Sequence, residues 1–216
     1  MKNSLNLATI APCLVAFSFL LVFNSAFDLL FLVDGTASVT GDNFRSSLRF
    51  VKNLAKVFND TITHFGLVVY AEGAETVFNL TNAFPLTTTN MTISSVIFPN
   101  QINRNTGSAL LYCKSQVLDS SGRAGVPKVL VVLQGGRSSD GIDEVSQVYR
   151  SSGFHVFGVG NGNQLSEGQL KEISSQPSSQ FYTAVGYGSI DLSSFVQTMR
   201  ASIANGEIVV IAIELE

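Results

Sequence analysis

The sequence predicts one α/β domain built on a doubly wound, mostly parallel β-sheet, with one antiparallel edge strand and helices on both faces. Apolar segments rich in Val, Leu and Phe alternate along the chain with segments whose apolar residues recur every three or four positions, and this alternation indicates strands that take turns with helices. The apolar segments are nearly continuous, which is typical of strands buried on both faces. No internal repeat, low-complexity stretch or interdomain linker divides the sequence.

Six segments have the character of strands. The first, Asp28 to Asp34, is apolar almost throughout. The third follows the second through Glu72-Gly73 and is expected to be the antiparallel edge of the sheet. The predicted strands are residues 28–34, 65–71, 76–80, 128–133, 154–159 and 180–185.

Six further segments are predicted to be helices. Asn43 to Phe58 carries a single apolar stripe, and Thr40 is a suitable N-cap for it. The segment Thr106 to Leu118 has Cys113 on its apolar face, and Pro99 is expected to end the helix before it. The predicted helices are residues 43–58, 92–98, 106–118, 142–151, 166–174 and 189–204.

The N-terminal segment has the composition of a secretory signal peptide. Lys2 is its only charge, an apolar stretch from Leu5 to Phe23 follows, and Ser25 and Ala26 are small. The strongest apolar part is shorter than the roughly 20 residues that span a bilayer, although an uncleaved signal anchor is the alternative. The predicted division is a signal peptide, residues 1–26, one domain, residues 27–204, and a C-terminal tail, residues 205–216.

Charge and cysteine content narrow the class of protein. Without its first 26 residues the chain has 12 basic and 16 acidic residues, a net charge of −4, and no basic cluster, which argues against a nucleic-acid partner. Cys113 is then the only cysteine, so no internal disulfide forms. Its place on an apolar helix face favours a buried thiol over an intermolecular link.

Three N-x-S/T triplets follow the predicted signal peptide. They make Asn59, Asn79 and Asn90 predicted acceptors of N-linked glycans. The apolar segment 208–213 is far too short to cross a bilayer, so no membrane span is expected in the mature chain. Together these features predict an extracellular, glycosylated surface.

The loop after the first predicted strand carries oxygen donors at alternate positions. Asp34, Thr36 and Ser38 supply one carboxylate and two hydroxyls. Ligands of open α/β sheets bind at the carboxyl ends of strands, and such oxygens suit a hard cation such as Mg²⁺ or Mn²⁺. The same residues also suit an ordinary βα turn, in which they would bond to loop amides.

Five segments together have the order and spacing of one family. They are the strand and loop Asp28 to Ser38, then Asn105 to Leu110, Gly122 to Leu133, Phe157 to Gly160 and Leu170 to Ile173. In these segments the chain resembles the von Willebrand factor type A domain, most closely the copies in type VI collagens and matrilins. The resemblance covers residues 28–204 and implies a Rossmann-like fold with a metal-ion-dependent adhesion site.

The resemblance also implies which residues would form that site. The family uses Asp-x-Ser-x-Ser, a Thr from a second loop, and an Asp in a Thr-Asp-Gly segment after a later strand. The fifth position is lost here, because Gln134-Gly135-Gly136 stands in place of Thr-Asp-Gly and Gly135 has no side-chain oxygen. The metal ligands carried over position by position are Asp34, Thr36, Ser38 and Thr106.

A site with a single carboxylate is predicted to hold Mg²⁺ or Mn²⁺ weakly or not at all, since losing a supporting carboxylate lowers metal affinity roughly 10–100-fold. In the first case a carboxylate of the bound partner completes the metal shell. In the second case the site has no functional metal. Asp140, on the next loop, is an alternative source of the missing carboxylate.

The leading functional interpretation is a secreted adhesion module of the extracellular matrix that binds proteins such as collagens. The alternative is a metal-independent structural assembly domain of a collagen-like matrix protein, in which the adhesion site is a relic. A truncated product of a larger multidomain chain is also compatible with the sequence.

An enzyme is not expected. His64 and His155 each begin a predicted strand, and the sequence pairs neither with a nucleophile. Arg123, Lys128 and Arg137 are interpreted as scattered surface charges.

Overall fold

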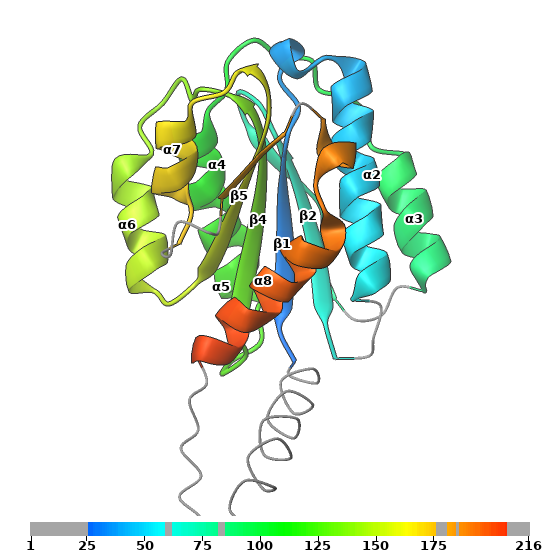
Figure 1. The fold of residues 1–216 in the computed structure, drawn as a ribbon, viewed down its shortest axis with the longest axis vertical. Coiled ribbons are helices and arrows are strands. Elements are labelled where there is room, and N and C mark those ends of the chain that lie inside the picture. Colours follow the sequence, from blue (N-terminus) through cyan, green and yellow to red (C-terminus); the bar gives the residue numbers. More distant parts are fainter. Residues whose placement is uncertain (1–25, 59–61, 82–84, 176–180, 185, 207–216) are drawn as a thin grey trace, which may run out of the picture.

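A computed structural model describes residues 26–58, 62–81, 85–175, 181–184 and 186–206, which form a central sheet between two layers of helices (Figure 1). The six strands lie in the order β3-β2-β1-β4-β5-β6. β2 and β3 pair antiparallel, and the other neighbours pair parallel. The predicted fold class is confirmed. The strands are β1 Asp28–Asp34, β2 His64–Tyr70, β3 Ala74–Thr81, β4 Lys128–Gly136, β5 His155–Gln164 and β6 Phe181–Ala184.

Helices cover both faces of the sheet (Figure 1). One face carries α2 Gly41–Val57, α3 Leu86–Ser94 and α8 Leu192–Gly206. The other carries α4 Thr106–Tyr112, the π-helical turn η4 Cys113–Leu118, α5 Asp119–Ser121, α6 Asp143–Ser151 and α7 Glu167–Ile173. Two 3₁₀ turns, η3 Ala37–Val39 and η6 Tyr187–Ser189, complete the described elements.

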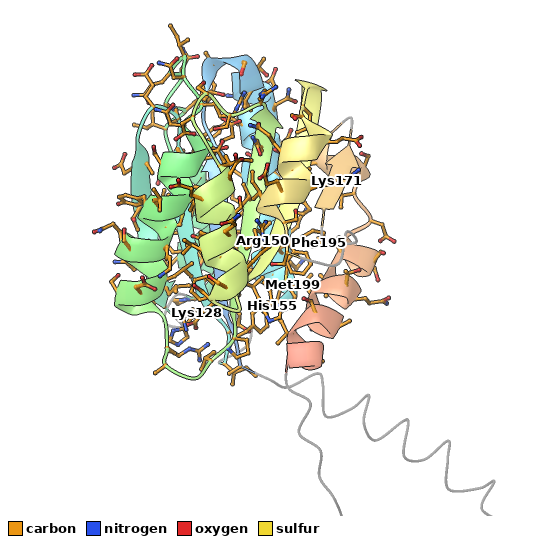
Figure 2. The ribbon with its side chains drawn as sticks, turned by 90° about the vertical axis from the view of Figure 1, so that its left-hand side faces the viewer. Lys128, Arg150, His155, Lys171, Phe195 and Met199 are labelled. Atoms are coloured by element: carbon orange, nitrogen blue, oxygen red, sulfur yellow. The ribbon has the colours of Figure 1, made fainter. Side chains whose placement is uncertain are left out.

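The sheet divides the core into two apolar clusters, because successive strand side chains point to opposite faces. Phe31 of β1 packs with α2 and α8, whereas its neighbour Leu32 packs with the α4 and α6 side. Figure 2 shows Phe195 and Met199 of α8 facing the sheet, and both are fully buried. Burial of one such large apolar side chain contributes about 1.5–3 kcal/mol.

Two local predictions, the N-cap of α2 and the buried cysteine of η4, agree with the structure. The Thr40 hydroxyl accepts a hydrogen bond from the Asn43 N–H at 3.4 Å, so Thr40 is the N-cap. Cys113 is buried, and burial raises the pKa of its thiol. The predicted buried thiol is therefore confirmed.

The helix predicted at residues 92–98 is wrong. α3 starts earlier and ends at Ser94, and the chain beyond it is not helical. The residue before a proline is disfavoured in a helix, and Pro99 follows Phe98. The non-helical chain lets the Phe98 ring lie 5.0 Å from the Phe44 ring of α2, so tertiary packing determines this segment.

Arg123 and Lys128 are not scattered surface charges, contrary to the prediction. Arg123 Nε donates to Asp28 Oδ1 and its backbone N–H donates to Asp28 Oδ2, both at 2.7 Å. Lys128 Nζ donates to the Arg123 carbonyl at 2.9 Å. Asp28 is fully buried, so its charge needs this compensation. Arg137 has an exposed side chain, as expected.

The ends of the described chain lie opposite the carboxyl ends of the parallel strands. β1 begins and α8 ends at the lower end of Figure 1, whereas the parallel strands finish at the upper end. The predicted signal peptide and tail lie almost wholly outside the described residues. Within the described residues, no helix is long and apolar enough to cross a membrane.

Candidate functional site

Three loops meet at the carboxyl ends of β1 and β4. They are residues 35–40 after β1, residues 95–105 before α4 (the second loop) and residues 137–142 after β4 (the third loop). The loop after β1 is tied to the second loop, because the Ala37 N–H donates to the Gln101 carbonyl at 2.7 Å. Gly35 permits this approach, since a Cβ there would lie 2.6 Å from Pro99 Cδ. The third loop is tied to the second, because the Ser139 N–H donates to the Arg104 carbonyl at 2.7 Å.

Asp34, Thr36 and Ser38 lie together in this place, and Thr36 is within hydrogen-bonding distance of both other residues. Asp34 Oδ1 accepts from the Thr36 N–H at 2.9 Å and from the Thr36 hydroxyl at 2.8 Å. The hydroxyl oxygens of Thr36 and Ser38 are 3.2 Å apart. Asp34 and Thr36 are buried. The loop therefore forms the side-chain-to-backbone turn expected of an aspartate in this position.

The guanidinium of Arg104 lies at the centre of these oxygens. Its Nε donates to Asp34 Oδ2 at 2.5 Å, and one terminal nitrogen donates to the Thr36 and Ser38 hydroxyls at 2.8 and 2.5 Å. The other terminal nitrogen donates to the Arg137 carbonyl at 3.1 Å. Arg104 is 6% exposed and Asp34 is 2% exposed. One buried arginine thus connects all three loops.

Thr106 is the first residue of α4, directly after the second loop, and its side chain faces a different partner. Its hydroxyl is 3.1 Å from the Tyr70 hydroxyl, and its backbone N–H donates to Ser138 Oγ at 3.1 Å. Burial, followed by the nearby charge of Asp34, raises the pKa of Tyr70 well above its usual range. Tyr70 is therefore uncharged near neutral pH, and the Thr106 side chain bonds to it and not to Asp34 or Arg104.

Gly135 contributes a backbone group in place of a side chain. Its N–H donates to Asp34 Oδ2 at 2.9 Å. The adjacent Gln134 points elsewhere, with its amide nitrogen donating to the Gly136 carbonyl at 2.6 Å. A Cβ on Gly136 would lie 2.5 Å from a terminal nitrogen of Arg104. Gly136 thus leaves the space that the guanidinium fills.

Asp140 does not join Asp34, so it does not replace the missing carboxylate. Its oxygens accept from the N–H groups of Gly107 and Ser108, both at 2.8 Å, and from Ser138 Oγ at 2.6 Å. Burial acts to raise the pKa of Asp140, but these hydrogen bonds outweigh it and lower the pKa. Asp140 holds the start of α4 against the third loop.

A comparison of families identifies the domain. The family model described as the von Willebrand factor type A domain matches residues 28–198, which include all three loops. The chain belongs to the von Willebrand factor type A family.

The relatives of this type A domain include proteins of the extracellular matrix. It is 32% identical to human matrilin-1 over 167 residues, which are 74% of this chain and 33% of matrilin-1. It is 26% identical to the human collagen alpha-1(XXI) chain over 156 residues, which are 71% of this chain and 16% of the relative. The chain therefore spans a third or less of the length of these relatives.

A solved structure has the same fold. Proximal thread matrix protein 1 from the mussel byssus, in a structure described as having a zinc-occupied MIDAS motif, matches with a TM-score of 0.72 and 21% identity. The match covers 83% of this chain and 46% of that chain. At this identity the likeness concerns the fold alone.

The residues at the adhesion site of this type A domain do not fit a divalent cation while Arg104 lies there. Each oxygen of Asp34 already accepts two hydrogen bonds. A cation bound to Asp34, Thr36 and Ser38 would have to lie against the positive guanidinium, and like charges repel. Among the described residues, no group of three or more His, Cys, Asp and Glu side chains is arranged to hold a metal.

Arg104 is the residue that sequence reasoning missed. It immediately precedes Asn105-Thr106, which belongs to a family motif, but no sequence pattern connects it with Asp34, 70 positions away. The useful signal was the loss of the family's aspartate at Gly135. A neighbouring basic residue is then a candidate to interact with the carboxylate that remains.

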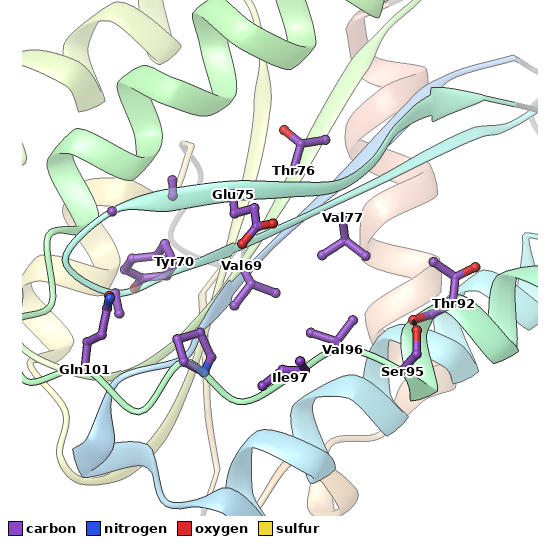
Figure 3. A pocket seen from close by; sticks show the side chains of 14 residues that line it. Val69, Tyr70, Glu75, Thr76, Val77, Thr92, Ser95, Val96, Ile97 and Gln101 are labelled. Carbon is purple, nitrogen blue, oxygen red and sulfur yellow. Dashed lines mark hydrogen bonds between the residues drawn. The ribbon is translucent and has the colours of Figure 1, made fainter.

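A groove adjoins the site along the edge of the sheet. It has a volume of about 590 Å³ and lies between β3 and residues 95–101. Figure 3 shows Val69, Val77 and Val96 around it, with Gln101 at the end nearest the site. Ile97, in its lining, is 85% exposed, and Ile102, next to the groove's end, is 83% exposed. The second loop therefore carries two large apolar side chains that are exposed to solvent.

The structure describes two of the three predicted glycan acceptors. Asn79 is exposed on β3, and Asn90 is half-buried on α3. Asn59 lies outside the described residues. His64 and His155 begin β2 and β5, as predicted, and burial lowers the pKa of both.

Proposed function

We propose that this type A domain is a secreted protein-binding module of the extracellular matrix, with a matrix protein such as a collagen as its partner. The observation that carries the proposal is the family match together with the relatives. The match includes all three loops of the candidate site, and the relatives include matrilin-1 and a collagen chain. Binding, and not catalysis, is the proposed activity.

The proposed contact surface is the carboxyl-end face of the sheet. This face lies opposite the ends of the described chain (Figure 1), so a tether at either end would leave it accessible. Ile102 lies beside it in the second loop and exposes 83% of its surface. Large apolar side chains that are exposed beside polar groups are common anchors of protein interfaces.

Binding to purified matrix proteins tests the proposal. The full chain, produced in secreting cells, is expected to bind immobilised fibrillar collagen or matrilin-1 saturably in a biosensor measurement. Ile102→Ser should weaken that binding about 5–30-fold, as expected when an interface anchor is truncated at a cost of about 1–2 kcal/mol.

Met91→Ser is the matched control, because Met91 is 73% exposed on α3. It should leave binding unchanged. Absence of saturable binding to both matrix proteins would contradict the proposed function, and equal losses from Ile102→Ser and Met91→Ser would contradict the proposed face.

One observation favours a second candidate, a metal-independent structural assembly domain of a collagen-like matrix protein. The buried Arg104 occupies the adhesion site, so a partner's carboxylate has no metal to complete. Sedimentation velocity distinguishes the two candidates. Reversible self-association that chelator leaves unchanged, without binding to collagen or matrilin-1, would favour assembly.

Secretion and glycosylation belong to the same proposal. Cleavage after Ala26 should give a mature chain that begins at Phe27, and mass spectrometry of the secreted protein measures that end directly. Glycans are expected on Asn79, which is exposed, and on Asn59 and Asn90. Peptide-N-glycosidase treatment should lower the mass accordingly, and an unchanged mass would contradict the glycan prediction.

A further inference from the structure

We propose that the guanidinium of Arg104 permanently replaces the divalent cation in the adhesion site of this type A domain, so that the site is complete without metal. The proposal rests on the contacts of Arg104 and does not require the proposed partner. It adds to the proposed function that binding is independent of divalent cations.

Arg104 contacts the side chains that the family's metal site would use. Four residues are carried over from the family's ligand set. Arg104 donates to the side chains of three of them, Asp34, Thr36 and Ser38. A hard cation coordinates oxygens directly, whereas a guanidinium donates hydrogen bonds to them from N–H groups in fixed directions. Arg104 therefore uses the same oxygens in a different kind of bond.

Arg104 also balances the charge of Asp34. Asp34 exposes 1% of its side chain and Arg104 exposes 7%, so the pair lies almost entirely away from water. A buried carboxylate without a compensating cation is strongly unfavourable. Arg104 supplies one positive charge permanently, whereas a divalent ion would supply two and leave one for a partner's carboxylate.

The end of β4 leaves room for the guanidinium. Gly136 has no side chain, and a Cβ there would lie 2.5 Å from one nitrogen of Arg104 and 3.1 Å from its central carbon. Gly135, where the family's aspartate would stand, donates its N–H to Asp34. The strand end thus provides both the room for the guanidinium and a further hydrogen bond to the carboxylate that it neutralises.

The guanidinium of Arg104 is not accessible to a binding partner. The Arg104 nitrogens donate to Asp34, Thr36, Ser38 and the Arg137 carbonyl, and the residue is 6% exposed. A carboxylate from outside therefore meets no accessible cation at this point. Recognition by this domain has to use the surrounding surface.

Thermal unfolding of the full chain tests the proposal without a partner. Mg²⁺, Mn²⁺ and EDTA should each leave the wild-type Tm unchanged. Arg104→Ala should lower the Tm by roughly 6–20 °C, because an unpaired buried charge remains. Arg137→Ala removes the same charge from an exposed position in the third loop and should change the Tm by less than about 2 °C.

The wild-type titration keeps the proposal testable even if Arg104→Ala does not fold. A saturable rise in Tm with Mn²⁺ that Ser38→Ala abolishes would overturn the proposal, because the guanidinium would then yield to a metal. Ser38 is exposed, so this control is expected to fold.

A double-mutant cycle measures the pairing itself. Asp34→Asn and Arg104→Gln are each expected to lower the Tm, and the double variant should lose less than the sum of the two. Strictly additive losses would overturn the proposal, because they would show that the two side chains do not interact.

The binding measurement separates this inference from the proposed function. Where the chain binds collagen or matrilin-1, EDTA should change the affinity by less than about twofold, and a loss of binding in EDTA that Mn²⁺ restores would overturn the inference. Where it binds neither protein, the proposed function fails while the Tm results still decide the role of Arg104.

Discussion

The two ends of β1 carry the same kind of ion pair in different surroundings. At the amino end, buried Asp28 pairs with Arg123, whose side chain is 26% exposed. At the carboxyl end, buried Asp34 pairs with Arg104, whose side chain is 7% exposed. Apart from the aspartate, Arg123 donates to the backbone carbonyl of Phe27, whereas Arg104 also donates to two hydroxyl side chains.

This difference separates a pair that closes the start of a strand from a pair that lies among the loops of the candidate site. Arg123 closes the start of a strand, and water reaches one side of it. Arg104 is enclosed by three loops, at the end of the sheet where ligands of this fold class bind. A similar Asp–Arg bond therefore anchors a strand at one end and lies within the candidate site at the other.

The largest expected effect comes from removing each arginine. Arg104→Ala should lower the free energy of unfolding by about 3–5 kcal/mol, the cost of leaving a buried charge unpaired. Arg123→Ala should cost about 1–3 kcal/mol, because water can reach Asp28 once the arginine is gone. Urea denaturation of both variants measures the difference. If Arg123→Ala lost as much free energy of unfolding as Arg104→Ala, or more, the two ion pairs of β1 would not differ as argued.

A smaller effect is expected from filling the space beside Arg104. Gly136→Ala places a methyl group 2.5 Å from the guanidinium, which is held on four sides, and should cost about 1–3 kcal/mol. Gly135→Ala meets a methyl group of Val39 at 2.6 Å, and that side chain can adjust more easily. Urea denaturation should therefore rank Gly136→Ala as the more destabilised variant. The reverse order would indicate that Arg104 moves readily.

Restoring the family's aspartate is expected to produce no cation binding as long as Arg104 is present. In Gly135→Asp the new Cβ would lie 3.4 Å from Asp34 Oδ2, so a second carboxylate would join the first with Arg104 still between the loops. Calorimetry with Mn²⁺ should detect no binding to Gly135→Asp and measurable binding to the double variant Gly135→Asp, Arg104→Ala. Equal affinities for the two would show that Arg104 does not exclude the cation.

Local patterns in the sequence were sufficient for much of the fold. The apolar run of β1, the stripe of α2 and the Thr40 cap depend on neighbouring residues. β1 and the cap were predicted as observed, and α2, predicted at residues 43–58, spans Gly41–Val57. The helix at residues 92–98 was not, because Phe98 is positioned by a ring on α2. Tertiary contacts of this kind override local propensity.

The candidate site could be predicted only in part for the same reason. Asp34, Thr36 and Ser38 are close in sequence and share one loop, so a motif was enough to group them. Arg104 reaches them across 66 to 70 positions, and its role follows from loop packing that no short pattern encodes. The sequence indicated that Gly135 stands where the family has an aspartate, and only the structure showed that Arg104 donates to Asp34.

Asp140 differs from Asp28 and Asp34 because it has no arginine partner. Backbone N–H groups and serine hydroxyls stabilise its charge, so its removal is expected to have the smallest effect on stability. Its pKa in the folded protein is below the ordinary value of 3.8. The stabilisation is therefore present above about pH 4 and is lost as the pH falls through the folded-state pKa. Asp140→Asn should cost about 0.3–1 kcal/mol at pH 6, as for a carboxylate at a helix start. Urea denaturation from pH 6 to pH 3 should show the variant approaching the wild type, whereas a constant difference would mean that packing and not charge makes Asp140 stabilising.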